Sequence, residues 1–341
     1  MSSVERASWF EKIPKAELHL HLEGAIPHEA LWELIQKYGG DPLVPDFEAL
    51  ERRFQYRDFS YFLAIWTWKN GFLREYEDFA WIATAVARDL AAQNIRYVEA
   101  FYSPADFTRY GLGTQGITTA IRRGLDRVPE VRVVLIADLV RDYGPEKGAK
   151  TLAELVEVRD QGVIGIGIGG SERTVPPETF REVYESARNS GFRTTAHAGE
   201  AAGPESIWGA VRVLEVDRIG HGTRAEEDDT LLEYLAEKEI PLEMCPLSNV
   251  RTAIVESLEQ HPIRRYVERG LTVTVNTDDP KMFGNSLAGE LRALSDVLGF
   301  SHGEVRALML AAVQASWLSE ADKSVLQATF TRDPAWSDEE D

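Results

Sequence analysis

An alternation of short apolar segments with charged amphipathic segments constrains the fold of this chain more than any other feature. Eight segments rich in β-branched and apolar residues end in polar residues or glycine, as buried parallel strands do. We expect strands in these segments: AELHLHL from Ala16, IRYVEAFY from Ile95, VRVVLIADLV from Val131, VIGIGIGG from Val163, RTTAHAGE from Arg193, DRIGHGT from Asp217, IPLEMCP from Ile240 and LTVTVNTDD from Leu271. Amphipathic helical stretches lie between them, for example at 30–38, 179–191 and 228–239. This alternation predicts an α/β fold, a (β/α)8 TIM-type barrel, with a doubly wound open sheet as the alternative.

The predicted barrel is a single domain, residues 1–341, with two additions. About seventy residues separate the first two strands, more than one crossover helix needs, so we expect a helical insertion at about 40–93. Its aromatic-rich part, 54–81, is interpreted as packing against the barrel and, in part, as an apolar lid. Extra C-terminal helices are expected from Leu287 and Gly303, followed by a flexible, solvated tail at 333–341.

The charge of the chain limits the classes of partner that it can bind. A formal net charge of −19 at pH 7 repels phosphate backbones and anionic lipids, so we expect neither a nucleic-acid nor a membrane partner. The one cysteine, Cys245, excludes an intrachain disulfide and a thiolate-cluster zinc site. Because no segment resembles a signal peptide or a membrane span, a cytoplasmic location is expected.

Histidines and carboxylates gather where the predicted strands end. Four of the seven histidines lie at such ends: His19, His21, His197 and His221. Three carboxylates follow the fifth and the eighth predicted strands: Glu200, Asp278 and Asp279. Residues i and i+2 of a strand face the same side, so His19 and His21 both face the barrel interior. An imidazole and carboxylate set of this kind suits a divalent transition ion with one position open for water. The other three histidines, at positions 28, 261 and 302, are expected to be solvated or to cap helices.

The segment GIGIGG, residues 165–170, satisfies the pattern G-x-G-x-x-G. A dinucleotide site needs that motif at the start of a helix, whereas these glycines lie within a predicted strand. We therefore interpret them as small residues that admit a ligand or pack the barrel.

Five motifs occur in a fixed order along the chain: PKAELHLHLEG, IGGSE, HAGE, RIGHGTR and NTDDP. This ordered set, which extends over about nine tenths of the chain, resembles the adenosine and adenine deaminases of the amidohydrolase superfamily. The resemblance implies hydrolytic deamination of a small-molecule 6-aminopurine, with one divalent metal ion per chain, zinc or another transition metal such as iron.

The resemblance also implies a role for each residue of the site. The metal ligands would be His19, His21, His197 and Asp278. Glu200 would donate a proton to purine N1, and His221 would assist the metal-bound hydroxide. Asp279 would hydrogen-bond N7, and the Gly170 N–H would reach N3. The segment FSYFLAIW matches the family's apolar lid, and four of its residues would line the sugar side: Phe59, Phe62, Leu63 and Trp66.

The chemistry supports these roles independently. Attack of water on an aromatic carbon needs a strong nucleophile at neutral pH, which a metal supplies by lowering the pKa of bound water. Glu200 can protonate the ring only if burial raises its pKa. N7 is a pure acceptor, so Asp279 would also have to be protonated, while Asp278 stays ionised on the metal.

Glu23 bears on the choice of substrate. Adenosine deaminases usually carry aspartate there, to hold the ribose 5′-hydroxyl, whereas glutamate is frequent in adenine deaminases. The segment GGSE, residues 169–172, instead resembles the adenosine enzymes. We predict that adenosine or a modified adenosine is converted to inosine or its analogue plus ammonia. Adenine, or another 6-substituted purine such as aminodeoxyfutalosine, is the alternative.

Two other functional classes are disfavoured by the residues present. A catalytically silent barrel that acts as a binding protein would be expected to lack a ligand or Glu200, and none is missing. An amidase or phosphoesterase of the superfamily would usually need a carboxylated lysine between two metals, and the predicted fourth strand contains no lysine.

Overall fold

The protein is described by a computed structural model that covers residues 8–55 and 59–337, with the backbone only for Phe59 and Ser60. All eight expected strands are present: β1 (Lys15–His21), β2 (Ile95–Tyr102), β3 (Arg132–Asp138), β4 (Val163–Gly167), β5 (Arg193–Ala198), β6 (Arg218–His221), β7 (Leu242–Met244) and β8 (Val273–Val275). They are parallel and pair in sequence order from β1 to β8.

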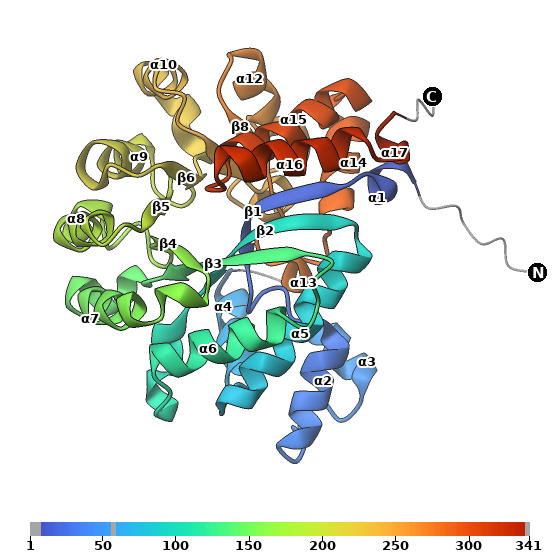
Figure 1. The fold of residues 1–341 in the computed structure, drawn as a ribbon, viewed down its shortest axis with the longest axis vertical. Helices are drawn as coiled ribbons and strands as arrows, with labels where there is room; N and C mark the ends of the chain where they lie inside the picture. The colour runs from blue at the N-terminus through green and yellow to red at the C-terminus, as the bar shows by residue number, and fades with distance from the viewer. Residues whose placement is uncertain (1–7, 56–58, 338–341) are drawn as a thin grey trace, which may run out of the picture.

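The first strand meets the end of the last one, so the sheet curls into a nearly closed barrel (Figure 1). Leu20 forms a parallel bridge with Asp278. The Leu18 N–H donates to the Asn276 side chain at 2.8 Å, and the His21 N–H donates to the Asp278 carbonyl at 2.8 Å. The (β/α)8 prediction is therefore confirmed, and the doubly wound alternative is wrong.

Helices surround the strands (Figure 1). The α-helices are α1 (Trp9–Lys12), α2 (His28–Lys37), α3 (Phe47–Arg53), α4 (Phe59–Asn70), α5 (Tyr76–Ala92), α6 (Thr114–Leu125), α7 (Gly144–Glu157), α8 (Arg181–Asn189), α9 (Pro204–Gly209), α10 (Asp229–Glu237), α11 (Pro246–Arg251), α12 (Ile263–Glu268), α13 (Pro280–Phe283), α14 (Leu287–Leu298), α15 (His302–Ala315), α16 (Glu320–Thr331) and α17 (Pro334–Ser337). Short 3-10 or π turns are η1 (Pro104–Tyr110), η2 (Arg141–Tyr143), η3 (Arg159–Gln161), η4 (Pro177–Phe180), η5 (Ala210–Leu214), η6 (Thr223–Glu227) and η7 (Leu258–Gln260). None of the helices within the described residues is long and apolar enough to cross a membrane.

The strands are buried because helices cover the outside of the barrel and side chains fill its inside. Every residue of β1 is buried, including two charged ones. At the start of β1, the Lys15 ammonium donates to the carbonyls of Phe10, Glu11 and Ile13 at 2.7 to 3.0 Å. Glu17 accepts from the backbone N–H and hydroxyl of Thr277. Both polar groups thus retain hydrogen bonds inside the fold.

The long connection between β1 and β2 is helical, as predicted, and consists of α2 to α5. In α4, Ile65, Lys69 and Asn70 are buried, while the Leu63 side chain faces solvent with 47% exposure. The Trp66 ring lies 6.3 Å from the His21 ring, at the carboxyl end of β1. Part of this helix therefore lies beside the carboxyl end of β1, and its role as a lid stays a prediction.

The C-terminal end differs from the expected solvated tail. Residues Pro334–Ser337 form α17, and Trp336 is buried against Phe330. The Trp9 indole N–H also donates to the Ala335 carbonyl at 2.9 Å. Burial of one indole outweighs the polarity of the neighbouring residues, so the end of the chain is anchored through residue 337. Residues 338–341 lie outside the described part.

Candidate metal and catalytic site

Four side chains meet at the carboxyl ends of the strands and point their donor atoms at one another. His19 and His21 extend from β1, His197 from β5, and Asp278 follows β8; all four are buried. The Nε2 atoms of His19 and His21 each lie 3.1 Å from Nε2 of His197. Asp278 Oδ1 lies 3.6 Å from His19 Nε2 and 3.3 Å from His21 Nε2.

These separations fit a single transition-metal ion. Ligand atoms about 2.0–2.1 Å from zinc, in tetrahedral arrangement, stand about 3.3 Å apart. The four donor atoms lie close enough to be shared by one ion. Burial, with the neighbouring histidines, holds the pKa of His19 and His197 well below the usual value, which keeps the rings neutral as metal ligands must be.

Two further side chains fix the orientation of these donors. Glu243, on β7, accepts a hydrogen bond from His19 Nδ1 at 2.8 Å, so His19 Nε2 presents its lone pair to the cluster. Ser248, in α11, donates to Asp278 Oδ2 at 2.6 Å, which leaves Oδ1 facing the histidines. The sequence reasoning missed both residues. Glu243 could have been found from the sequence, because it is a carboxylate inside a predicted strand, just as the two histidines lie inside one.

Glu243 belongs to a charged layer inside the barrel. Arg218 donates to Glu243 Oε1 and to Glu99 Oε2, both at 2.6 Å, and its guanidinium stacks on the Trp317 ring. Each of the three charged groups is fully buried and paired with the others. Removing one partner would leave a buried charge uncompensated, so this layer holds β2, β6 and β7 in register below the site.

The backbone is strained at two positions of the site. His221 at the end of β6 has φ of 62°, and Asp278 has φ of 65°. Non-glycine residues rarely adopt this left-handed region, and such strain of about 1–3 kcal/mol persists where surrounding structure over-determines it. Here it turns the imidazole and the carboxylate into the barrel mouth.

Glu200 lies beside His221 at the mouth of the barrel. Its Oε2 is 3.7 Å from His221 Nε2, and its side chain retains 22% exposure. Burial raises the pKa of Glu200, while the neighbouring His221 opposes that effect. A carboxyl group of this kind can hold a proton at a higher pH than an ordinary glutamate.

The loop that carries Glu200 is clamped by Glu172, which the sequence reasoning did not identify. Glu172 Oε1 accepts from the Gly199 N–H at 2.6 Å, and Oε2 accepts from the N–H groups of Ala201 and Ala202 at 2.6 and 2.9 Å. The motif GGSE thus ends in a residue that holds the backbone on both sides of Glu200.

Asp279 and Glu23 form a second pair of buried carboxyl groups next to the metal-ligand cluster. Asp279 Oδ1 has no hydrogen-bond partner among the described residues, and the carboxyl packs where Gly24 leaves room, since a Cβ there would come within 1.7 Å of it. Burial and the adjacent Asp278 raise the pKa of Asp279 well above its usual value. The pKa of Asp278 is instead held down by the surrounding histidines and Ser248 despite its burial, so the pKa values of the two adjacent aspartates are shifted in opposite directions.

Glu23 has one free oxygen. Its Oε1 accepts from the Ser103 N–H at 3.0 Å, while the buried Oε2 is unpartnered within the described part of the chain. Lys69 of α4 lies nearby and donates to the Glu23 backbone carbonyl at 2.6 Å and to Asn70 at 2.8 Å. Burial raises the pKa of Glu23 and lowers that of Lys69.

The remaining predicted residues surround these groups. Gly170 follows β4 with φ of 96°, and its N–H takes part in no hydrogen bond among the described residues. In α4, the Phe62 ring stacks on Phe283 at 5.2 Å, Trp66 contacts His21, and Leu63 is exposed. The side chain of Phe59 lies outside the described part.

Two other buried residues, Cys245 and His261, lie near these groups. Cys245 is buried with its thiol pKa raised well above normal, so it is a small interior residue rather than a nucleophile. His261 was expected to be solvated or capping, and this prediction is wrong: the ring is buried and its Nε2 lies 3.2 Å from Asn249 Oδ1. The segment around it folds back under α11, which sequence neighbours alone do not indicate.

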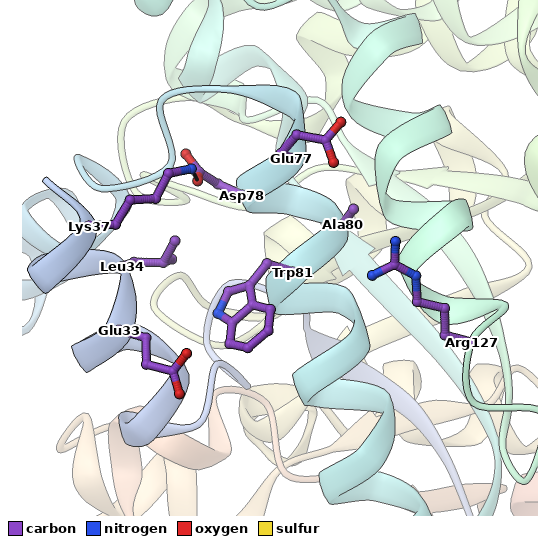
Figure 2. A pocket seen from close by; sticks show the side chains of 8 residues that line it. All are labelled: Glu33, Leu34, Lys37, Glu77, Asp78, Ala80, Trp81 and Arg127. Carbon is purple, nitrogen blue, oxygen red and sulfur yellow. Dashed lines mark hydrogen bonds and ion pairs between the residues drawn. The ribbon is translucent and has the colours of Figure 1, made fainter.

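A surface hollow of about 360 Å³ lies away from this site, between α2, α5 and the segment after α6 (Figure 2). Its one buried carboxylate, Asp78, is already used by the Lys37 ammonium, the Tyr38 hydroxyl and the backbone N–H groups that begin α5. The hollow therefore offers no unpaired buried carboxylate.

Comparison with known sequences identifies relatives over nearly the whole chain. The family model described as adenosine deaminase matches residues 14–331. Adenine deaminase of Bordetella parapertussis is 38% identical over 304 residues, which is 88% of this chain and 95% of that protein. Aminodeoxyfutalosine deaminase of Streptomyces avermitilis is 35% identical over 335 residues, 96% of this chain and 94% of that protein.

Solved structures agree with these relatives. Adenine deaminase of Arthrobacter aurescens superposes with a TM-score of 0.87 at 32% identity, covering 94% of this chain and 98% of that one. An amidohydrolase of Burkhoderia ambifaria with bound Zn superposes with a TM-score of 0.88 at 27% identity, covering 97% and 93%.

Proposed function

The chain belongs to the adenosine deaminase family and is a purine deaminase, a hydrolase that acts on C–N bonds. We propose that its substrate is a 6-aminopurine nucleoside, either adenosine or a 5′-modified adenosine. In the overall reaction, water adds to C6 of the purine, the bond between C6 and the amino nitrogen breaks, and ammonia leaves. The products are the 6-oxopurine nucleoside and ammonia.

The ligands of the metal in this proposal are His19, His21, His197 and Asp278. Three neutral imidazoles and one carboxylate at mutual distances of 3.1 to 3.6 Å fit zinc or another divalent transition metal such as iron. When bound, such an ion lowers the pKa of a water ligand to about 7 and so supplies the nucleophile.

Glu200 is proposed as the proton donor to purine N1. Protonation of N1 draws electrons from C6 and makes that carbon more open to attack. The raised pKa of Glu200 supports this role, because the carboxyl group then holds its proton nearer to neutral pH. His221, whose Nε2 lies 3.7 Å from Glu200, is proposed to act on the oxygen that enters at C6.

Asp279 and Gly170 are proposed to hold the two other nitrogen acceptors of the ring. N7 can only accept, so Asp279 must donate as the protonated acid, in keeping with its raised pKa and its unpartnered oxygen. The unused N–H of Gly170 is suited to N3. Together with Glu200, these groups would fix the ring plane so that C6 faces the metal.

The observation that carries the choice of a nucleoside is the unpartnered Oε2 of Glu23. A buried carboxylate oxygen without a donor is costly, so the bound substrate is expected to supply one. Ribose hydroxyls are such donors. Glu23 lies two residues beyond His21, closer to Asp279 than to Glu200. The additional methylene of glutamate, compared with aspartate, favours a sugar whose 5′ position is altered.

The end of β4 has no room for side chains. A Cβ on Gly169 would come within 2.9 Å of Asp138, and one on Gly170 within 2.1 Å of Asp142. Only glycine therefore fits at these two positions, next to the N–H that is proposed to reach N3. We propose that the lid residues Phe62, Leu63 and Trp66 cover the apolar side of the sugar.

Adenine is the second candidate substrate. Free adenine carries an N9–H, which could donate to the same oxygen of Glu23, and relatives in Bordetella and Arthrobacter are named adenine deaminases. The lack of nucleic-acid and membrane partners remains a prediction from charge. The cytoplasmic location remains a prediction from the lack of a segment that resembles a signal peptide or a membrane span.

Ammonia release from a substrate panel tests the proposal. We expect kcat/KM to be highest for adenosine, 5′-deoxyadenosine or aminodeoxyfutalosine and at least about ten-fold lower for adenine, because adenine leaves the sugar contacts unmade. AMP serves as the control for the effect of a 5′-phosphate, and cytidine as the control for a pyrimidine ring in place of the purine.

A Glu23→Gln variant refines that test, with Glu23→Asp as its matched control. Loss of a charge-assisted hydrogen bond should raise KM for nucleosides by about ten-fold or more. A higher kcat/KM for adenine than for every nucleoside would reject the nucleoside proposal in favour of the second candidate.

A further inference from the structure

A buried chain of hydrogen bonds runs behind His221, away from the metal-ligand cluster. Asn249 lies in α11, and His261 follows η7. Asn249 Nδ2 lies 3.2 Å from His221 Nδ1, and Asn249 Oδ1 lies 3.2 Å from His261 Nε2. Both side chains are fully buried. Neither residue was singled out for a catalytic role by the sequence motifs.

The chain has a fixed direction because it starts at a backbone amide. The Ile263 N–H donates to His261 Nδ1 at 3.3 Å, and an amide N–H cannot accept. His261 Nδ1 must therefore carry a lone pair. Burial, with Arg265 and His221 nearby, lowers the pKa of His261 to about 3, so the ring is neutral and its proton is on Nε2.

The protonated Nε2 of His261 determines the orientation of the Asn249 amide. The group facing it must be the carbonyl oxygen, which also accepts from the Thr223 hydroxyl at 2.9 Å. The opposite orientation would set the NH2 group against an N–H. The Asn249 NH2 group consequently faces His221 Nδ1 and donates to it.

His221 Nδ1 is then an acceptor, and the proton of the neutral ring is on Nε2. The Nε2 atom is the one that faces the site, 3.7 Å from Glu200 Oε2.

We propose that Asn249 and His261 are positioning residues that hold His221 as the Nε2–H tautomer, so that His221 donates a hydrogen bond to the oxygen entering at purine C6. In this form Nε2 has no lone pair with which to take a proton from the attacking water. The donor role rests on the proposed deamination, whereas the tautomer follows from the hydrogen bonds alone.

Nitrogen NMR of the zinc-loaded full chain, labelled with 15N-histidine, tests the tautomer directly. We expect a pyrrole-type signal for Nε2 and a pyridine-type signal for Nδ1 of His221, assigned through a His221→Asn variant. A pyrrole-type signal for Nδ1 of His221 in the wild-type protein would overturn the proposal, whatever the substrate is.

An Asn249→Asp variant reverses the last link while keeping the shape of the side chain. A carboxylate can only accept, so His221 should move its proton to Nδ1 or become doubly protonated. We expect a pyrrole-type Nδ1 signal and a kcat lower by about 10²-fold or more, with KM changed by less than about three-fold, since a wrong tautomer affects the chemical step. An unchanged Nδ1 signal would contradict the inferred contact.

Two more variants separate positioning from packing. His261→Gln, which offers an N–H at the place of Nε2, should keep kcat within about three-fold, whereas His261→Phe should lower it by about ten-fold or more. Thr223→Val removes the other donor to Asn249 and serves as the control, with the tautomer unchanged. Equal loss in His261→Gln and His261→Phe would reduce the chain to a packing role. Unaltered spectra together with no turnover on any purine would instead reject the proposed function and leave the tautomer standing.

Discussion

Glu200 is the residue whose protonation we expect to limit the reaction. Glu200→Gln should retain the metal, because none of the four proposed ligands is altered, and should lower kcat by about 10²- to 10⁴-fold. The metal content of the purified variant and its steady-state rate check this prediction. Turnover near that of the wild type would contradict the proton-donor role.

The pH dependence of the wild-type enzyme follows from the same carboxyl group. A donor acts only in its protonated form, and burial raises the pKa of Glu200, so kcat/KM should stay high toward neutral pH and fall as the pH rises through that raised pKa. The measurement is a profile of kcat/KM against pH for one nucleoside. Loss of this basic limb in Glu200→Gln would assign it to Glu200, and an identical limb in the variant would assign it to another group.

At the scale of the element, the loop after β5 owes its shape to one carboxylate on the loop after β4. Glu172 accepts three backbone hydrogen bonds from residues 199–202. Glu172→Ala should lower kcat by about ten-fold or more, because Glu200 loses its fixed position, while the protein stays folded. Glu205→Ala is the matched control, since Glu205 bonds the Gly203 N–H just beyond the loop. Similar kinetics for the two variants would contradict the clamp.

At the scale of the whole molecule, the proposed ligands join opposite parts of the barrel. They come from β1, from β5 and from the segment after β8, so a bound ion crosslinks elements far apart in the sequence. Removing the metal with a chelator should lower Tm by several degrees, since a ligand at 1,000 times its Kd adds about 4 kcal/mol. Zinc should restore Tm in the wild type and leave His197→Ala unchanged. A Tm that is insensitive to metal would contradict the shared site.

The barrel and the metal cluster were predictable because their signals are local and periodic. Eight apolar segments gave the fold, and a spacing of two residues put His19 and His21 on one face of β1. The exact ends of the strands were less predictable: β7 is only Leu242–Met244 and β8 only Val273–Val275. Hydrogen bonding across the barrel, rather than apolar composition, decides where such strands end.

By itself, then, the sequence determined the fold class, and its resemblance to a family of deaminases implied the four proposed ligands and the type of reaction. Only the tertiary structure decided which groups orient the side chains of the site. Glu243 bonds His19, and Ser248 bonds Asp278. Glu172 holds the loop around Glu200, and Asn249 and His261 lie behind His221. The physical reason is that hydrogen bonds depend on distance and direction between residues that here lie 12 to 224 positions apart. No periodicity along a chain records such contacts, and the proton on His221 depends on one of them.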